Sequence, residues 1–282
     1  MEKALILGAS GYAGRAIAKA LAGSYDVFGT CRTVGREPAG DAGAAMLAFD
    51  VAQRGSLREI LHSVRPHVIV SALRGDFEQQ LAAHREAADY LQAVPNGKLV
   101  FLSTANVFDR DRTRAHTEQD DPDPQSEYGC YKAACERMLR GELGAKCAIV
   151  RIPAIWGPDC PRLNQLRADL AAHRTIPTLS NILVNVTTDR QVAEFIAFLL
   201  REDKSGIFHV GSDDLCDYTQ FQRLVCDALQ LGTPRFEITA CSQTEYQAVL
   251  CGRADIPHAL RCTIPEVISY LTGAATAEHA AF

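Results

Sequence analysis

The sequence predicts an α/β fold built on a doubly wound parallel sheet, with a smaller C-terminal substrate-binding region. Three observations predict it. Short apolar runs alternate with amphipathic helical patterns, a glycine-rich turn follows the first apolar run, and 47% of the residues are hydrophobic and 22% charged, as in ordinary globular proteins. Because strands covered by helices on both faces are apolar throughout, the alternation is typical of a parallel sheet. The 282 residues suffice for one or two domains.

Each predicted strand of this sheet is a short apolar run, and the predicted helices lie between the runs. The strands are Ala4–Gly8, Asp26–Thr30, Leu47–Asp50, Val68–Ser71, Leu99–Ser103 and Cys147–Arg151. The helices cover residues 12–22, 56–64, 77–93 and 126–141. We expect residues 1–157 to form the core domain.

The pattern changes after Gly157, so we expect residues 158–282 to form mainly a second region. Residues 158–187 are rich in Pro, Arg and Asn and are expected to leave the sheet, whereas residues 189–210 are expected to return to the core. The expected elements are helices over 162–173, 189–201 and 218–230 and a strand Ile207–Val210. Ser242 and Glu245 have capping-box spacing, which predicts another helix. The Ala-rich tail from Gly273 is expected to fray.

The glycine-rich turn reads Gly8-Ala-Ser-Gly-Tyr-Ala-Gly14 and joins a buried strand to a helix. Gly8 permits a tight turn, Gly11 lets backbone N–H groups approach a pyrophosphate, and Gly14 lets the helix pack closely on the sheet. The positive end of the helix dipole favours an anion there. The turn in this context predicts a dinucleotide site.

Composition excludes several classes of function. The formal net charge of -5 gives no footprint for nucleic acid. No apolar stretch is long enough for a membrane span, and the N-terminal apolar run is too short for a signal peptide. The ten cysteines include no Cys-x-x-Cys and no zinc-ligand spacing, so we expect free thiols, no metal and a cytoplasmic setting.

Tyr128 and Lys132 are four residues apart, so on a helix they share one face. A nearby ammonium stabilises phenolate over phenol, which would lower the Tyr128 pKa and make it a general acid or base. Ser103 and Thr104 end a strand at the carboxyl edge of the sheet, where doubly wound folds bind ligands. Each signal also has a purely structural interpretation. Tyr128 and Lys132 could be an ordinary pair on an exposed helix face, and the hydroxyls of Ser103 and Thr104 could be a local cap. Their joint occurrence with the glycine turn favours catalysis.

These stretches give the chain a resemblance to the extended short-chain dehydrogenase/reductase superfamily, and within it to the dTDP-4-dehydrorhamnose reductase family. The matching stretches are Gly8–Gly14, Phe49–Val51, Leu102–Asp109, Tyr128–Lys132 with Glu136, Val150–Gly157 and Val186–Ala193. The resemblance covers nearly the whole chain. It implies a Rossmann-like fold and a nicotinamide cofactor.

The resemblance also implies roles for individual residues. Tyr128 would give its proton to a carbonyl oxygen of a sugar, Thr104, with Ser103 as a possible helper, would orient that oxygen, and Lys132 would hold the nicotinamide ribose. The implied cofactor-binding residues are Gly8, Ser10, Gly11, Tyr12, Ala13, Gly14, Arg32, Asp50, Val51, Ser71, Ala72, Leu73, Ser103, Tyr128, Lys132 and Ile152.

The residues after the second predicted strand indicate which cofactor is used. An acidic residue there would hold the ribose 2′-OH of NAD, but the chain reads Gly29-Thr-Cys-Arg32. Arg32 suits a 2′-phosphate, so NADP(H) is favoured over NAD(H), although a solvated surface arginine is the alternative.

Two stretches depart from the reductase pattern. Ala105-Asn106 replaces the usual Asp-Tyr after Thr104, so the resemblance does not predict the residues of the substrate pocket here. The same change disfavours a 4,6-dehydratase, because neither residue exchanges protons. Ser71–Asp76 replaces an Asn followed by small residues, and this change is expected to alter how the nicotinamide end is held.

The substrate, a small molecule and by the resemblance a nucleotide sugar, is expected to meet residues from several stretches. The substrate candidates are Asn106, Trp156, Arg162 and Asn164, with Arg167 and Arg174 as further cations. Trp156 would either stack on a base or fill the core. A homodimer is the default expectation.

Three functions stay open: an NADPH-dependent reductase of a nucleotide-linked 4-keto sugar, an epimerase that cycles bound NAD, and a non-catalytic NADP-binding regulatory subunit. A reductase consumes NADPH in proportion to product, whereas an epimerase does not. Arg32 favours the reductase, and the intact Tyr128 and Lys132 argue against the regulatory subunit.

Overall fold

The computed structural model describes residues 1–34, 44–53 and 55–273 of the chain. They form two compact units that interleave along the sequence. The first unit takes the described residues of Met1–Val107, Pro124–Arg151 and Val192–Phe208. The second takes those of Phe108–Asp123, Ile152–Gln191 and His209–Phe282.

The first unit is built on a seven-stranded sheet in the order β10-β6-β5-β4-β1-β2-β3. Its strands are β1 (Lys3–Leu7), β2 (Asp26–Cys31), β3 (Ala44–Ala48), β4 (Val68–Ser71), β5 (Lys98–Thr104), β6 (Cys147–Ile152) and β10 (Gly206–His209). The pairs β1–β2, β1–β4, β2–β3 and β4–β5 are parallel. The strand order reverses beside β1, so the sheet is doubly wound and the predicted fold class is confirmed.

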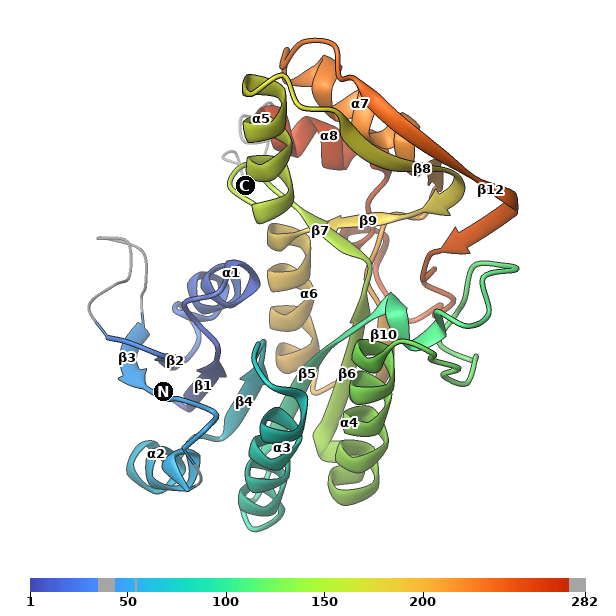
Figure 1. Ribbon diagram of the computed structural model, residues 1–282. Coiled ribbons are helices and arrows are strands. Elements are labelled where there is room, and N and C mark those ends of the chain that lie inside the picture. Colours follow the sequence, from blue (N-terminus) through green and yellow to red (C-terminus); the bar gives the residue numbers. More distant parts are fainter. Residues whose placement is uncertain (35–43, 54, 274–282) are drawn as a thin grey trace. The chain divides into compact units, whose positions relative to one another are not determined.

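Helices cover both faces of this sheet (Figure 1). They are α1 (Tyr12–Leu21), α2 (Ser56–Val64), α3 (Phe77–Gln92), α4 (Glu127–Leu143) and α6 (Asp189–Arg201), with short 3₁₀ turns η1 (Ala105–Phe108) and η2 (Gly144–Lys146). The helices α2, α3 and α4 pack side by side on one face, and α1 and α6 lie on the other. Right-handed crossovers produce this arrangement where the strand order reverses.

The core of the first unit lies between the sheet and the helices α2, α3 and α4. Leu5, Ile69 and Leu99 on adjacent strands are fully buried against Leu91 of α3 and Leu139 of α4. The helix starts have local caps: the Asp76 carboxylate accepts from the Gln79 N–H and the Ser126 hydroxyl accepts from the Gly129 N–H. These two side-chain caps therefore define where α3 and α4 begin.

The second unit has a three-stranded sheet in the order β11-β8-β12 and a parallel pair β7-β9. Its strands are β7 (Ala154–Trp156), β8 (Ile176–Val184), β9 (Val186–Thr188), β11 (Cys216–Asp217) and β12 (Phe236–Gln247). Its helices are α5 (Pro161–Ala171), α7 (Tyr218–Ala228) and α8 (Ile264–Thr272), with the 3₁₀ turn η3 (His258–Leu260). The described part of residues 158–187 thus includes two strands of this unit.

Two predictions of secondary structure are wrong. No helix begins at Ser242, because residues 236–247 form β12, which pairs in parallel with β8 and bulges between Ala240 and Glu245. Backbone pairing with a distant strand overrides the local cap signal there. The third strand ends at Ala48 rather than Asp50, since it pairs with Val27–Cys31 of β2, and Phe49–Val51 lie in the following loop.

The C-terminal helix α8 was not predicted, although its local signals are present. Thr263 and Glu266 form a capping box, Pro265 lies in the first turn, and Gly273 ends the helix in the left-handed conformation with φ +77°. The Ala-rich tail beyond Gly273 lies outside the described residues.

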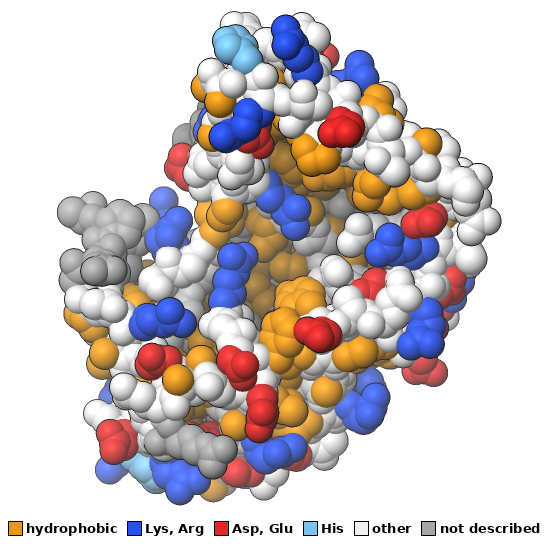
Figure 2. Space-filling model, viewed as in Figure 1, with side chains coloured by type: hydrophobic (Ala, Val, Ile, Leu, Met, Phe, Trp, Pro, Cys, Tyr) orange, Lys and Arg blue, Asp and Glu red, His pale blue; other side chains and the backbone are white. Residues whose placement is uncertain are grey.

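Charges of both signs are interspersed over the described residues on the face in Figure 2. The ten cysteines are all free thiols, five of them buried. Among the described residues, no group of His, Cys, Asp and Glu side chains has the arrangement of a metal site. None of the helices in that part of the chain is both long and apolar enough to span a bilayer.

Candidate active site

The glycine turn between β1 and α1 is closed by backbone contacts that leave no room for side chains. Gly8 has φ +81°, and a Cβ on it would lie 2.7 Å from the carbonyl oxygen of Ala72. A Cβ on Gly14 would lie 2.2 Å from the carbonyl oxygen of Gly8. The N–H of Gly8 donates to the Thr30 hydroxyl at 2.9 Å. This is the cradle that a dinucleotide's phosphates require, so the residues present fit such a cofactor.

A pocket of about 300 Å³ opens beside this turn. Eight residues expected at the cofactor line it: Gly8, Ser10, Gly11, Arg32, Asp50, Val51, Ala72 and Leu73. Four further lining residues were not expected: Thr30, Cys31, Phe49 and Arg74. Tyr12, Ala13 and Gly14 form the first turn of α1 and are not part of this lining. The chain segments 8–11, 30–32, 49–51 and 72–74 therefore meet at one site.

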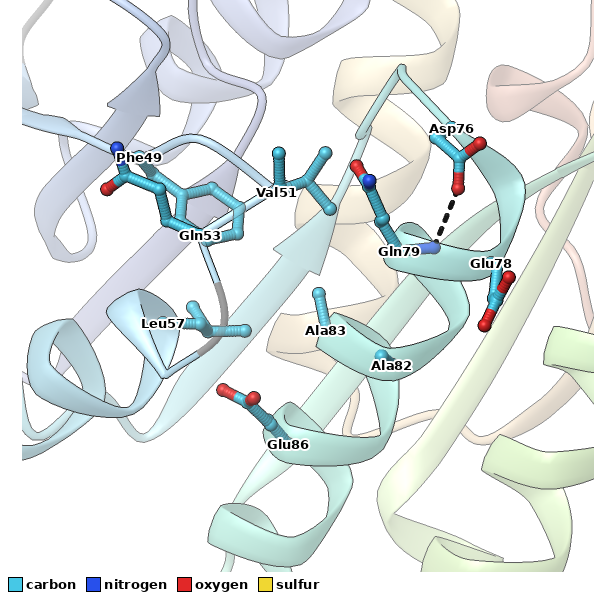
Figure 3. A pocket seen from close by; sticks show the side chains of 11 residues that line it. Phe49, Val51, Gln53, Leu57, Asp76, Glu78, Gln79, Ala82, Ala83 and Glu86 are labelled. Atoms are coloured by element: carbon cyan, nitrogen blue, oxygen red, sulfur yellow. Dashed lines mark hydrogen bonds between the residues drawn. The ribbon is translucent and has the colours of Figure 1, made fainter.

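A second pocket, of about 280 Å³, shares Phe49 and Val51 with the first (Figure 3). It lies between α2 and the start of α3, where Leu57, Ala82 and Ala83 line it together with polar side chains. The polar lining residues are Gln53, Asp76, Glu78, Gln79 and Glu86. An acidic lining is unsuited to phosphate, so the two pockets differ in the ligands that they favour.

Tyr128 lies in the first turn of α4, and Thr104 ends β5. Tyr128 is 40% exposed, whereas Thr104 is 8% exposed. The Thr104 hydroxyl donates to Asn106 Oδ1 at 3.2 Å and accepts from the Asn106 N–H at 3.3 Å. It is also close enough to the phenol of Tyr128 to favour the phenolate and act to lower its pKa. The structure thus brings three predicted site residues, Thr104, Asn106 and Tyr128, to one place.

Lys132 lies one turn after Tyr128 on the same helix, but its ammonium points at the sheet. Its Nζ donates to the carbonyl oxygen of Leu102 at 2.7 Å and lies 4.4 Å from the ring centre of Phe101. The ring centre of Tyr128 is 5.9 Å away. Burial lowers the pKa of Lys132 to about 8.

The expected effect of Lys132 on the Tyr128 pKa is wrong for this arrangement. The pKa of Tyr128 is raised above its ordinary value, because partial burial disfavours the charged phenolate. The Thr104 hydroxyl and the charge of Arg74 act in the opposite direction. Lys132 is directed toward Leu102 instead, and the cation that favours phenolate is Arg74.

The Ser103 hydroxyl is hydrogen-bonded to a buried ion pair. It donates to Glu136 Oε1, and the same carboxylate accepts from Arg151 through Nε at 3.1 Å and Nη2 at 2.7 Å. Glu136 and Arg151 are 2% and 0% exposed. Ser71 is also buried, with its hydroxyl 2.6 Å from Nε2 of His84. Both serine hydroxyls are therefore bonded to other side chains, and Thr104, which is itself bonded to Asn106, is the hydroxyl beside Tyr128.

The remaining predicted residues belong to the second unit. Ile152 ends β6 and is 8% exposed. Trp156 is 1% exposed and meets Phe221 edge-on at 5.0 Å, so of the two interpretations of this indole the core position is the observed one. Arg162 and Asn164 lie exposed on α5, and Asn164 donates to the carbonyl oxygen of Asp159.

The two further cations of this unit have intramolecular partners. Arg167 donates to the carbonyl oxygen of Pro158 at 2.8 Å, and Arg174 pairs with Asp169 at 2.7 Å. Neither contact prevents anion binding, but both limit how far the guanidinium groups reach.

Comparisons with known proteins agree with the fold. Residues 2–251 match the family described as RmlD substrate binding domain. A dTDP-4-dehydrorhamnose reductase of Aggregatibacter actinomycetemcomitans is 26% identical over 80% of this chain and 79% of its own length. The methionine adenosyltransferase 2 subunit beta of Danio rerio is likewise 26% identical, over 82% of this chain and 75% of its own.

Among solved structures, the dTDP-4-dehydrorhamnose reductase of Bacillus anthracis in complex with NADP superposes with a TM-score of 0.75. It is 19% identical and covers 95% of this chain and 97% of its own. The family match spans most of the sequence, and the doubly wound sheet, the glycine turn and the Tyr-Lys helix are all present. The chain therefore belongs to the RmlD substrate-binding domain family of the extended short-chain dehydrogenase/reductase superfamily.

Proposed function

We propose that the chain is an NADPH-dependent reductase of a nucleotide-linked 4-keto sugar. The observation that carries the proposal is that the Thr104 hydroxyl at the end of β5 lies beside the phenol of Tyr128, one helical turn before Lys132, in the unit that also holds the glycine turn. A phenol beside a second hydroxyl at the carboxyl edge of a parallel sheet is placed to give a proton to a carbonyl oxygen.

A bound nicotinamide would supply the hydride that reduces the carbonyl carbon. Tyr128 transfers its proton to the carbonyl oxygen, so the ketone becomes an alcohol and the phenolate is reprotonated from solvent through its exposed side. The Thr104 hydroxyl would orient the same oxygen, and Lys132, whose ammonium donates to the Leu102 carbonyl in this structure, would hold the nicotinamide ribose when the cofactor is bound. The raised Tyr128 pKa keeps the phenol protonated at neutral pH, as a general acid requires.

NADPH is the proposed cofactor because Arg32 lines the pocket beside the glycine turn and residues 30–32, at the end of β2, include no carboxylate. The NADP complex of the Bacillus anthracis relative supports the same choice. We propose that residues 1–157 hold the cofactor and the acid, and that residues 158–282, with Arg162 and Asn164 exposed on α5, mainly take the substrate. A homodimer and a cytoplasmic setting stay predictions.

The test is to mix the purified protein with NADPH and a panel of nucleotide-linked 4-keto sugars and to follow the loss of NADPH absorbance. Stoichiometric oxidation that Tyr128→Phe abolishes supports the proposal. Conversion of an ordinary nucleotide sugar to its epimer without net NADPH loss would identify an epimerase instead. Turnover by Tyr128→Phe at the wild-type rate would refute the assigned acid.

A regulatory subunit that binds NADP without turnover is the second candidate. Two observations favour it: the match to the methionine adenosyltransferase subunit, and the hydrogen bond that directs Lys132 to Leu102. NADPH binding by calorimetry with no oxidation of cofactor by any keto sugar would support this candidate over the reductase.

A further inference from the structure

The loop between β4 and α3, residues 72–76, carries Arg74, a cation to which the glycine turn assigns no role. The loop begins beside Ser71, whose hydroxyl lies 2.6 Å from Nε2 of His84. Nδ1 of His84 lies 3.7 Å from the Cys135 thiol of α4. Burial, with a smaller effect of the Lys132 charge, lowers the pKa of His84 to about 3, so the imidazole is neutral. A buried neutral hydrogen-bond chain therefore holds the start of the loop.

A second buried chain holds the other end of the loop. The Gln80 side-chain amide donates to the carbonyl oxygen of Gly75 at 2.7 Å and accepts from the Tyr131 hydroxyl at 3.1 Å. Gly75 has φ +146°, a conformation that favours glycine, and a Cβ on it would lie 3.1 Å from Val51. Because both ends are fixed, the backbone that carries Arg74 is placed within narrow limits.

Arg74 extends from this braced loop into the wall of the pocket beside the glycine turn. It lines that pocket together with Gly8, Gly11 and Ala72. Its charge acts to lower the pKa of both Tyr128 and Lys132, so Arg74 is near the proposed acid as well as beside the phosphate cradle. Within the described residues, the guanidinium makes no hydrogen bond or ion pair, which leaves all its donors available for a ligand.

We propose that Arg74 binds the cofactor's pyrophosphate from the side opposite the glycine turn, an inference that rests on the proposed function. A guanidinium binds two oxygens of a phosphate at once, and the backbone N–H groups of the turn approach from β1 and α1. Arg32, on the β2 side of the same pocket, then faces the 2′-phosphate. The two arginines thus recognise different phosphates of one ligand.

The experiment measures binding by calorimetry with two fragments that cannot react. Adenosine 2′-monophosphate carries the 2′-phosphate without a diphosphate, and 2′-phospho-ADP-ribose carries both without nicotinamide. We expect Arg74→Gln to weaken 2′-phospho-ADP-ribose about tenfold, the lower range for a hydrogen bond to a charged group, and to leave adenosine 2′-monophosphate unchanged. Arg32→Gln should weaken both fragments.

Two further variants make the result specific. Arg74→Lys keeps the charge without the bidentate geometry, so its affinity for 2′-phospho-ADP-ribose should lie between wild type and Arg74→Gln. Arg137→Gln removes an exposed positive charge from α4 and should change neither affinity. Equal losses for both fragments in Arg74→Gln, or no loss for 2′-phospho-ADP-ribose, would overturn the inference.

A diphosphate could also come from the nucleotide sugar, so deoxythymidine diphosphate is titrated in parallel. Weaker binding of that nucleotide alone in Arg74→Gln would assign Arg74 to the substrate and overturn the cofactor assignment. These measurements do not depend on turnover. If Arg74→Gln weakens only 2′-phospho-ADP-ribose but the wild type reduces no keto sugar, the proposed function fails and the role of Arg74 holds. If the wild type reduces a keto sugar but Arg74→Gln does not show this difference between the fragments, the proposed function holds and the role of Arg74 fails.

Discussion

Arg151 and Glu136 form an ion pair in which neither side chain reaches solvent, and the Ser103 hydroxyl donates to the same carboxylate. The pair joins β6 to α4, and Ser103 adds the end of β5. Ser103 precedes Thr104, and Glu136 lies one turn after Lys132. This contact therefore fixes the strand end and the helix that together carry the proposed acid and its hydroxyl partner.

Arg151→Met should strongly destabilise the protein, because it leaves the Glu136 carboxylate buried without its counter-charge. Breaking one half of a buried pair costs about 3–5 kcal/mol in free energy of unfolding. Urea denaturation measures this loss. The matched control is Arg85→Met, which breaks a pair with Glu142 at 3.7 Å whose side chains are 57% and 29% exposed, and which should cost about 0–1 kcal/mol. Similar losses in both variants would contradict the role given to the buried pair.

Tyr128→Phe removes the proposed acid while keeping the aromatic ring. We expect kcat to fall by about 10²–10⁴-fold, the range for loss of a general acid, with little change in affinity for 2′-phospho-ADP-ribose. Thr104→Ala should reduce kcat less, because the phenol remains. Steady-state rates with the best keto sugar, together with calorimetry, separate the two effects. A parallel loss of rate and cofactor affinity would instead indicate a disturbed fold.

Lys132 gives the stability of the protein a specific dependence on pH. Its pKa is about 8 when folded and higher when unfolded, so between these values the unfolded chain binds more protons. The free energy of unfolding should therefore rise with pH above 8 in the wild type relative to Lys132→Met. Denaturant titrations of both proteins between about pH 7 and 10 measure the difference. A difference that stays constant across this range would refute the lowered pKa.

Gly14 and Gly141 are both helical glycines, but alanine should have opposite effects at the two positions. A Cβ at Gly14 would collide with the Gly8 carbonyl oxygen, whereas a Cβ at Gly141 meets nothing within 4 Å. Gly141→Ala should stabilise α4 by about 0.5–1 kcal/mol through its helix propensity. Gly14→Ala should destabilise the turn and weaken cofactor binding. Thermal unfolding and calorimetry test both substitutions, and stabilisation by Gly14→Ala would rule out the observed turn geometry.

Much of the first unit was predictable because its signals are local. The ranges 56–64 and 68–71, and helix 189–201, agree with α2, β4 and α6 residue for residue. Strands covered on both faces are apolar runs, and caps mark the helix starts. The second unit was predicted less completely, because β8 and β12 are defined by pairing with each other across more than one helix, and Ser242 carries a cap signal that this pairing overrides.

In the candidate site too, residues with local sequence signals were predicted, and contacts that depend on distant parts of the chain were not. Spacing and strand ends were enough to predict the residues of the glycine turn and the neighbourhood of Thr104 and Tyr128. The direction of the Lys132 side chain was not predictable, because it depends on the Leu102 carbonyl of β5. Arg74 was missed as a lining residue, although the unusual Ser71–Asp76 stretch was the signal that could have identified it.

The helix that bears the acid also braces the loop after β4. Tyr131 and Cys135 lie on α4 near Tyr128 and reach Gln80 and His84, whose partners define the ends of that loop. Any shift of α4 is thus transmitted to the backbone lining the nucleotide pocket. Substitutions far along α4 are expected to appear first as altered nucleotide affinity, and bound nucleotide in turn to slow hydrogen exchange of buried α4 amides.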